Sequence, residues 1–152
     1  MRFFKGKSMK KILLLSMIVG TMFIFSGCGA RGPQFQSFEK PKDPNNGMVY
    51  IYRKAQLFGD ALNYKITTNN NYLGDMKING YTNKELPSGI IKLYASTTSI
   101  DKITFKFELP KNKIICIKTY IGFGIILGRP KFEIVDMNKC KKEIKDTKKL
   151  LD

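Results

Sequence analysis

The sequence predicts a mainly β fold, an antiparallel β-sandwich with a short C-terminal helix, on three observations. Apolar and polar residues alternate with a period of two through most of residues 47–136. Turn-forming Asn, Gly and Pro residues separate these runs at intervals of about 8–12 residues, as in sandwiches and barrels. From residue 137 the apolar period becomes helical. The β-sandwich domain with its helix is therefore expected to span residues 47–152.

Eight runs have the composition and alternation of strands. They are residues 48–54, 61–68, 72–78, 81–86, 90–97, 102–109, 113–122 and 131–136. The alternation is clearest between Ile103 and Leu109, where every second residue is apolar and is expected to face the core. Asn79-Gly80 and Pro87-Ser88-Gly89 mark turns between strands, because Asn and Gly tolerate left-handed backbone.

Residues 137–152 are predicted to form the helix. Its apolar stripe comprises Met137, Cys140, Ile144, Thr147 and Leu151. Most other positions are charged, and Asp136 or Asn138 can cap its first turn. The helix is expected to lie against the sandwich edge, and a basic helix on a membrane surface is the alternative.

The N-terminal residues read as an export signal. Basic residues without any acid precede an apolar run from Ile12 to Phe25. This run has about 14 residues, whereas a membrane-spanning helix needs roughly 20. Residues 1–27 are therefore expected to be a signal peptide.

The end of this leader, Phe25-Ser26-Gly27-Cys28, resembles the lipobox of bacterial lipoproteins. Ser26, Gly27 and Cys28 fit that box, whereas Phe25 stands where Leu is usual. The resemblance implies that Cys28 becomes the acylated first residue and that membrane lipid is a partner. Ordinary secretion with cleavage after Ala30 and an uncleaved anchor are the alternatives.

Residues 28–46 contain three prolines and little apolar periodicity, and we expect them to be an acylated flexible tether. As a loose coil this tether spans roughly 25 Å. Gly29 follows the cysteine, and in well-studied Gram-negative sorting an Asp there favours the inner membrane. The expected location is therefore the outer membrane, facing the periplasm, with the inner membrane or the cell surface as alternatives.

Three motifs carry a family resemblance: "GMVYIYR" at the start of the domain, "LPSGIIKLYAS" in its middle and "GRPKFEIVD" near its end. They resemble an uncharacterised family of bacterial lipoproteins with small β domains, distantly similar to the PEGA type. The resemblance implies a transthyretin-like or carboxypeptidase-regulatory-like β-sandwich. It implies no activity and no catalytic residues.

The charge favours anionic partners other than nucleic acid. The formal charge is +15, and residues 28–152 retain +10 once the leader is removed. Only four of the 27 basic residues are Arg, the usual reader of phosphates and base edges, so no nucleic acid is expected. Lipid headgroups and cell-wall polymers are the candidate anionic surfaces, and a solvated Lys-rich surface without a partner is the favoured alternative.

The absence of His excludes Ser-His and Cys-His dyads and ordinary zinc sites. The 12 acidic residues form no recognisable pair motif. We therefore expect no enzyme, no catalytic residue, no cofactor and no metal.

Four residues of the domain are candidate sites. Arg53 and Arg129 either form an anion-binding pair or have structural roles, paired with an acid such as Glu133 or Asp136 or with loop carbonyls. Cys116 and Cys140 either form a disulfide in an oxidising envelope, or Cys116 is only a small core residue.

Two further patterns each have a functional and a structural interpretation. Residues 122–128, "GFGIILG", differ by one position from a dinucleotide loop and indicate a strand break or a bulged hairpin. The seven tyrosines could line a glycan-binding face, although Tyr in strands is more often sheet packing.

The expected function is that of a membrane-anchored envelope lipoprotein, a non-enzymatic structural or interaction module. Its partner beyond lipid would be an envelope protein or a cell-wall polymer. The alternative is a binding module for cell-wall glycan or another anionic polymer, through a Lys-rich surface that contains Tyr.

Overall fold

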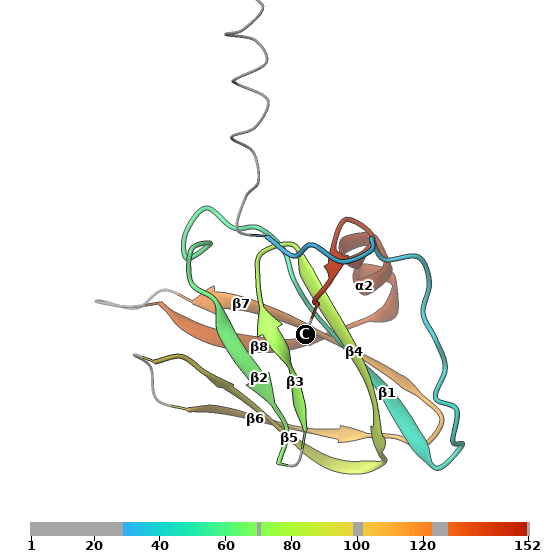
Figure 1. The fold of residues 1–152 in the computed structure, drawn as a ribbon. Helices are drawn as coiled ribbons and strands as arrows, with labels where there is room; N and C mark the ends of the chain where they lie inside the picture. Colours follow the sequence, from blue (N-terminus) through green and yellow to red (C-terminus); the bar gives the residue numbers. More distant parts are fainter. Residues whose placement is uncertain (1–28, 70, 99–101, 123–127, 152) are drawn as a thin grey trace, which may run out of the picture.

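The computed structural model describes residues 29–69, 71–98, 102–122 and 128–151 and shows a β-sandwich with one short helix (Figure 1). The mainly β prediction is confirmed. The strands are β1 (Asn46–Arg53), β2 (Tyr64–Thr67), β3 (Tyr72–Met76), β4 (Gly80–Pro87), β5 (Gly89–Ser96), β6 (Ile103–Leu109), β7 (Ile114–Gly122), β8 (Arg129–Val135) and β9 (Lys148–Lys149), and the helix is α2 (Met137–Ile144).

The strands form two sheets. The first sheet has the order β8-β7-β1-β4-β9, and the second has the order β3-β2-β5-β6. Most neighbours are antiparallel, as expected, but β1 pairs with β7 in parallel and β4 pairs with β9 in parallel. β1 is the central strand of the first sheet, hydrogen-bonded to β4 on one side and to β7 on the other.

Left-handed residues make the turns that the sequence predicted. Asn79 has a φ of 50° just before β4, and Gly89 has a φ of 122° between β4 and β5. Asn112, between β6 and β7, has a φ of 53°. Each of these three connections passes from one sheet to the other, and Asn and Gly suit them because they tolerate this region of backbone space.

The main core fills the space between the two sheets. It is built from Val49, Ile51, Tyr64, Ile66, Leu73, Met76, Leu86, Leu93, Ala95, Phe107, Leu109, Ile117, Ile121 and Leu150. In β6, Phe107 and Leu109 are buried while Lys106 and Glu108 are exposed, so the predicted alternation is confirmed. The same alternation orients every core strand, because successive side chains point to opposite faces.

A second core, which the sequence did not predict, covers the outer face of the first sheet. Its buried members are Phe35, Met48, Tyr50, Tyr52, Tyr81, Cys116, Val135, Cys140 and Ile144. The side chains come from three places: the sheet itself, the segment before β1 and helix α2. As a result every residue of β1 from Gly47 to Arg53 is buried.

Residues 29–46 therefore differ from the flexible tether that we expected. The amide of Ala30 donates to the carbonyl of Ile78 at 3.3 Å, and the amide of Phe35 donates to the carbonyl of Thr147 at 3.0 Å. Between them, Gly32 donates to the carbonyl of Lys149 at 3.0 Å. Figure 1 shows this segment, in blue, running along the domain before it enters β1. Prolines do not oppose this packing, because an extended segment on a sheet edge suits their fixed φ.

Aromatic contacts hold the segment to the sheet. The ring of Phe35 lies 5.4 Å from that of Tyr81, and the ring of Phe38 lies 5.0 Å from that of Tyr50, both edge-to-face. Such pairs contribute about 0.5–1.5 kcal/mol beyond the area that they bury. The amide of Glu39 also donates to the Tyr50 hydroxyl at 2.7 Å.

The C-terminal helix is shorter than predicted. Asp136 caps it as expected, its Oδ1 accepting from the amides of Asn138 and Lys139 at 3.0 and 2.9 Å. The helix ends at Ile144, where the Thr147 hydroxyl donates to the Ile144 carbonyl at 2.6 Å. The chain then returns as β9, because this route adds a strand to the sheet and buries Leu150 in the main core.

The predicted apolar stripe is confirmed for three of its five residues. Cys140, Ile144 and Thr147 are buried. Met137 and Leu151 are exposed, and the helix prediction over residues 145–151 is wrong, because the extended backbone of β9 turns Leu150 inward in place of Leu151.

Replacing Phe35 with Ala is expected to lower the free energy of unfolding by about 3 kcal/mol, because the aromatic cluster over β1 loses its central ring. Residues 29–46 should then become sensitive to limited proteolysis. Urea unfolding and mass-mapped proteolysis measure both effects, with the exposed neighbour substitution Gln36→Ala as the control. A Phe35→Ala protein whose segment resists protease as well as the wild type contradicts this packing role.

Candidate functional site

The lipid-attachment residue predicted from the sequence, Cys28, lies outside the described residues. The described chain begins at Gly29, beside the turn between β3 and β4. Ala30 is tied to Ile78 of that turn, so the chain enters the structure at one defined corner of the sandwich.

Arg53, at the end of β1, is fully buried. Its two terminal nitrogens donate to the carbonyls of Gly59 and Leu62, each at 2.6 Å. Its guanidinium carbon also lies 5.2 Å from the centre of the Tyr64 ring, a cation–π contact. Burial lowers the pKa of Arg53 from its usual value, against the opposing effects of Tyr64 and Asp60.

Tyr64, which contacts Arg53, is also buried and hydrogen-bonded. The Tyr64 hydroxyl lies 2.8 Å from that of Thr119, which donates to the carbonyl of Lys131. Burial raises the pKa of Tyr64 to about 12, partly offset by its hydrogen bond to Thr119 and by the charge of Arg53. Arg53, Tyr64 and Thr119 thus form a polar column that crosses between the sheets.

The two arginines do not form an anion-binding pair. Arg53 is inaccessible, whereas Arg129 is exposed at the first residue of β8. Of the structural alternatives, Arg53 follows the one in which loop carbonyls bind it through its terminal nitrogens, whereas its buried Nε has no hydrogen-bond partner among the described residues. Glu133, proposed as an arginine partner, instead pairs with Lys139 at 2.9 Å.

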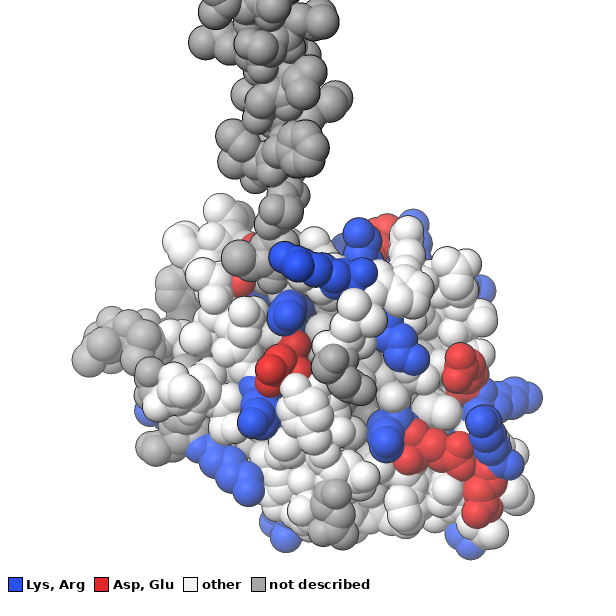
Figure 2. All heavy atoms as spheres, viewed as in Figure 1, with Lys and Arg blue, Asp and Glu red and all other residues white. Residues whose placement is uncertain are grey.

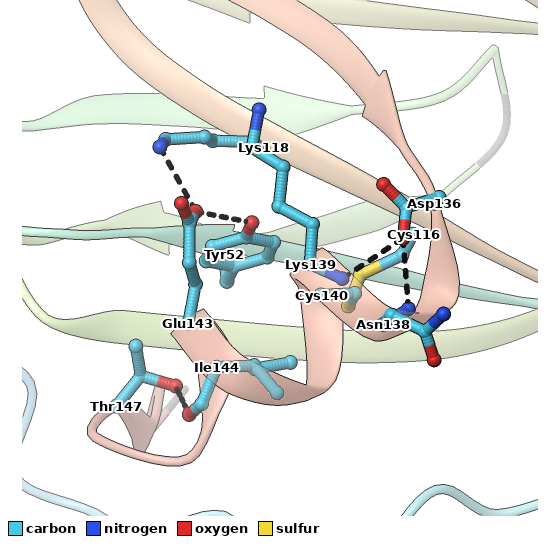
Figure 3. The surroundings of a disulfide bond; sticks show 10 residues. All are labelled: Tyr52, Cys116, Lys118, Asp136, Asn138, Lys139, Cys140, Glu143, Ile144 and Thr147. Carbon is cyan, nitrogen blue, oxygen red and sulfur yellow. Dashed lines mark hydrogen bonds and ion pairs between the residues drawn. A yellow bond between two sulfur atoms is a disulfide. The ribbon is translucent and has the colours of Figure 1, made fainter.

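Cys116 of β7 and Cys140 of α2 form a disulfide, with their Cα atoms 6.2 Å apart (Figure 3). The bond closes a loop between residues 24 apart in sequence. Closing a loop of this size stabilises a fold by about 3 kcal/mol. Because both cysteines are buried in the outer core, we read the bond as a structural staple between helix and sheet.

A second link between helix and sheet is polar. The Tyr52 hydroxyl donates to Glu143 Oε2 at 2.7 Å, and Lys118 Nζ lies 2.9 Å from the same oxygen (Figure 3). Burial, followed by the hydrogen bond and charge of Glu143, raises the pKa of Tyr52 and keeps it neutral. Burial also acts to raise the pKa of Glu143, but the hydrogen bonds from Lys118 and Tyr52 outweigh it and lower that pKa.

Lysines gather around two adjoining open depressions beside α2, which we call the basic groove. Its lysines are Lys54, Lys118, Lys139, Lys142 and Lys145. The depressions measure about 340 and 610 Å³ and share Lys54. Three acids intervene, each within ion-pair distance of one lysine, and among the described residues Lys142 and Lys145 form no ion pair. The groove can attract an anionic chain, though its net charge is modest.

Most tyrosines are unavailable to a glycan. Tyr50, Tyr52, Tyr64 and Tyr81 are buried in the two cores. Tyr72 is exposed on β3 at the edge of the second sheet, away from the basic groove in sequence and in sheet order.

A pair of exposed apolar residues was missed in the sequence. Leu57 and Phe58, in the loop between β1 and β2, are 95% and 67% exposed. The signal was present as a pair of large apolar residues in the loop between two predicted strands, but composition alone gives such a pair no orientation. The predicted strand break at residues 122–128 falls mostly on residues 123–127, which lie outside the described ones.

The described part of the chain has neither a metal-binding cluster nor a membrane-spanning helix. No group of His, Cys, Asp or Glu side chains there is arranged to hold a metal ion. No helix among those residues is long and apolar enough to cross a membrane. Comparison with known proteins finds no matching family model, no matching curated protein and no matching solved structure.

The substitution Arg53→Met is expected to lower the free energy of unfolding by about 3 kcal/mol, because two loop carbonyls lose their donor in a buried site. The matched control is Arg129→Met, which removes an exposed arginine and should change stability by less than about 0.5 kcal/mol. Chemical denaturation measures both. Equal losses for the two variants would refute the distinct role given to Arg53.

Proposed function

We propose that this protein is an acylated lipoprotein of the bacterial cell envelope, a non-enzymatic structural or interaction module held on a membrane through Cys28. The observation that carries the proposal is the leader: a basic start, an apolar run from Ile12 to Phe25, and the small residues Ser26 and Gly27 before Cys28. Gly29 after the cysteine favours the outer membrane, facing the periplasm. Two or more acyl chains anchor a protein stably, since each buried CH₂ contributes about 0.8 kcal/mol.

The disulfide supports an extracytoplasmic location. Disulfides persist in oxidising compartments such as the periplasm and are rare in the cytosol. Cys116 and Cys140 are paired, which leaves Cys28 as the one cysteine of the sequence with its thiol available for acylation.

The surroundings of the acidic groups support a non-enzymatic role. Glu143 is held by Lys118 and Tyr52, and Asp136 caps α2. Glu85 accepts hydrogen bonds from the amides of Lys42 and Asp43, which lower its pKa. Each of these carboxylates therefore holds the fold together, and the chain has no His to act as a base at neutral pH.

Membrane fractionation and intact mass of the natively expressed protein test this proposal. The wild type should carry acyl mass on Cys28 and remain with the membrane, whereas Cys28→Ala should lose both. The double variant Cys116→Ala/Cys140→Ala removes two thiols and leaves Cys28 unchanged, so it should stay acylated. A wild-type protein that is free of membrane and cut after Ala30 would refute the proposal.

The basic groove supports a second candidate function, binding of an anionic cell-wall polymer. Lys142 of α2 and Lys145, which caps that helix, are exposed, and both line the larger depression together with Lys54. Like charges that converge on an open depression raise the local concentration of an anionic chain. This candidate is compatible with acylation, because Lys142 and Lys145 lie at the C-terminal end of α2 and acylation concerns Cys28.

Retention on purified peptidoglycan separates the two candidates. The detergent-solubilised full-length protein should be retained at low salt, and Lys142→Gln/Lys145→Gln should reduce retention roughly thirtyfold, at about 1 kcal/mol for each lysine. The matched control is Lys92→Gln/Lys106→Gln, a facing pair of exposed lysines on the second sheet. Absence of retention at low salt, or equal losses for the two double variants, rejects polymer binding at the groove.

A further inference from the structure

The loop between β1 and β2 presents an apolar tip to solvent. Leu57 is 95% exposed, the largest exposed fraction among the exposed large apolar residues that the structure describes, and Phe58 beside it is 67% exposed. Single exposed apolar residues are common on any protein. Two adjacent exposed apolar residues at the tip of a loop are less common. Their position on the domain indicates what they contact.

The loop is held in a defined shape. From below, the buried Arg53 binds the carbonyls of Gly59 and Leu62. Within the loop, the Gln56 amide donates to Asp60 Oδ1 at 2.9 Å. Gly59 has a φ of 82° and a backbone so close to Ile121 that an added Cβ would lie 2.7 Å from it. These contacts fix the two ends of the tip, so the exposure of Leu57 and Phe58 is a property of the folded loop.

The tip lies beside the point where the described chain begins. The Ala55 amide donates to Asn79 Oδ1 at 3.0 Å, and the Ala30 amide donates to the carbonyl of Ile78. Ile78 and Asn79 are consecutive residues of one turn, so the loop and the N-terminal segment meet there (Figure 1). Two residues of extended chain reach at most about 7 Å, so a group attached two residues before Ala30 cannot lie farther than that from Ala30 along the backbone.

Cations surround this meeting point. Arg31, Lys54 and Lys77 each lie one residue from a residue that forms these two contacts, and Arg31 is exposed. Figure 2 shows Lys and Arg side chains gathered below the point where the described chain begins. The one acid of the loop, Asp60, is occupied by the Gln56 amide. An apolar tip beside basic residues suits the surface of an anionic bilayer.

We infer that Leu57 and Phe58 insert into the same lipid leaflet that holds the acyl chains of Cys28, so that the domain docks on the bilayer by this corner. The inference rests on the proposed acylation. Because residues 29–46 are packed on the domain, only a short length of chain separates the proposed lipid attachment from the loop. A bilayer is therefore the occupant that the geometry brings to the tip, whereas a protein partner would have to compete with the membrane for it.

A fluorescent reporter on the loop tests the insertion without altering its apolar tip. Ala61→Cys, at an exposed position of the loop, is labelled with an environment-sensitive dye in the acylated full-length protein. Cys116 and Cys140 are in a disulfide, so the new thiol reacts alone. The protein is reconstituted into vesicles of phosphatidylethanolamine and phosphatidylglycerol with brominated acyl chains, which quench dyes that enter the bilayer.

The matched control is the same label at Ile90→Cys. Ile90 is 69% exposed and follows the far end of β4 from the turn that holds Ala30. The eight residues of β4 place its ends about 23 Å apart. We expect severalfold stronger quenching at position 61 than at position 90. Leu57→Gln/Phe58→Gln should reduce the quenching at position 61 to the level of the control, with the protein still bound to vesicles.

The possible results distinguish a failure of the lipid attachment from a failure of the loop insertion. Protein that fails to float with the vesicles refutes the lipid attachment itself. Protein that floats but shows equal quenching at positions 61 and 90, or quenching unchanged by the Gln substitutions, overturns only the insertion of the loop. A blue shift at position 61 without quenching, increasing with protein density, also overturns it and identifies a second protein as the occupant.

Discussion

The burial of β1 on both faces is the constraint on which the rest of this structure depends. One face of the strand, with Val49 and Ile51, requires the second sheet as its cover. The other face, with Tyr50 and Tyr52, requires a cover that no strand supplies. Burying a large apolar side chain contributes about 1.5–3 kcal/mol, so an uncovered outer face would forfeit much of the stability of a small domain. The N-terminal segment and α2 meet that requirement, and the disulfide and Glu143 fix the helix in place.

This constraint also determines how the domain relates to its proposed anchor. A cover made from residues 29–46 cannot at the same time be a free tether, because Phe35 has to remain on Tyr81 and Tyr50. The segment that precedes β1 is therefore part of the fold and runs back across the first sheet to the turn at Ile78. The anchor proposed at Cys28 consequently joins the domain at one corner of the sandwich. For a lipoprotein, that arrangement gives the domain a preferred orientation on the membrane.

The sequence predicted those features that depend on local pattern. Alternation in residues 102–109, the left-handed turn at Asn79 and the cap at Asp136 all depend on neighbours within a few positions, and all three are present. The features it missed depend on distant contacts. Phe35 and Phe38 are isolated aromatics in a Pro-rich stretch, and their role depends on Tyr50 and Tyr81, which follow later in the chain. The run "MVYIY", apolar or aromatic at consecutive positions, was the available signal that β1 is covered on both faces.

Arg53 shows why a candidate site residue can be identified from sequence while its role is not. A lone arginine in a β-rich motif fits an anion site and a structural site equally well, and only burial distinguishes them. Removing a guanidinium from water is unfavourable, and replacing a whole buried ion pair with apolar residues is often neutral or stabilising. An apolar residue, however, cannot hold the carbonyls of Gly59 and Leu62 at fixed positions. The charge is therefore best understood through the loop that it shapes. That loop projects Leu57 and Phe58 at the corner where the N-terminal segment also begins, so the buried arginine and the packed segment serve the same end of the molecule.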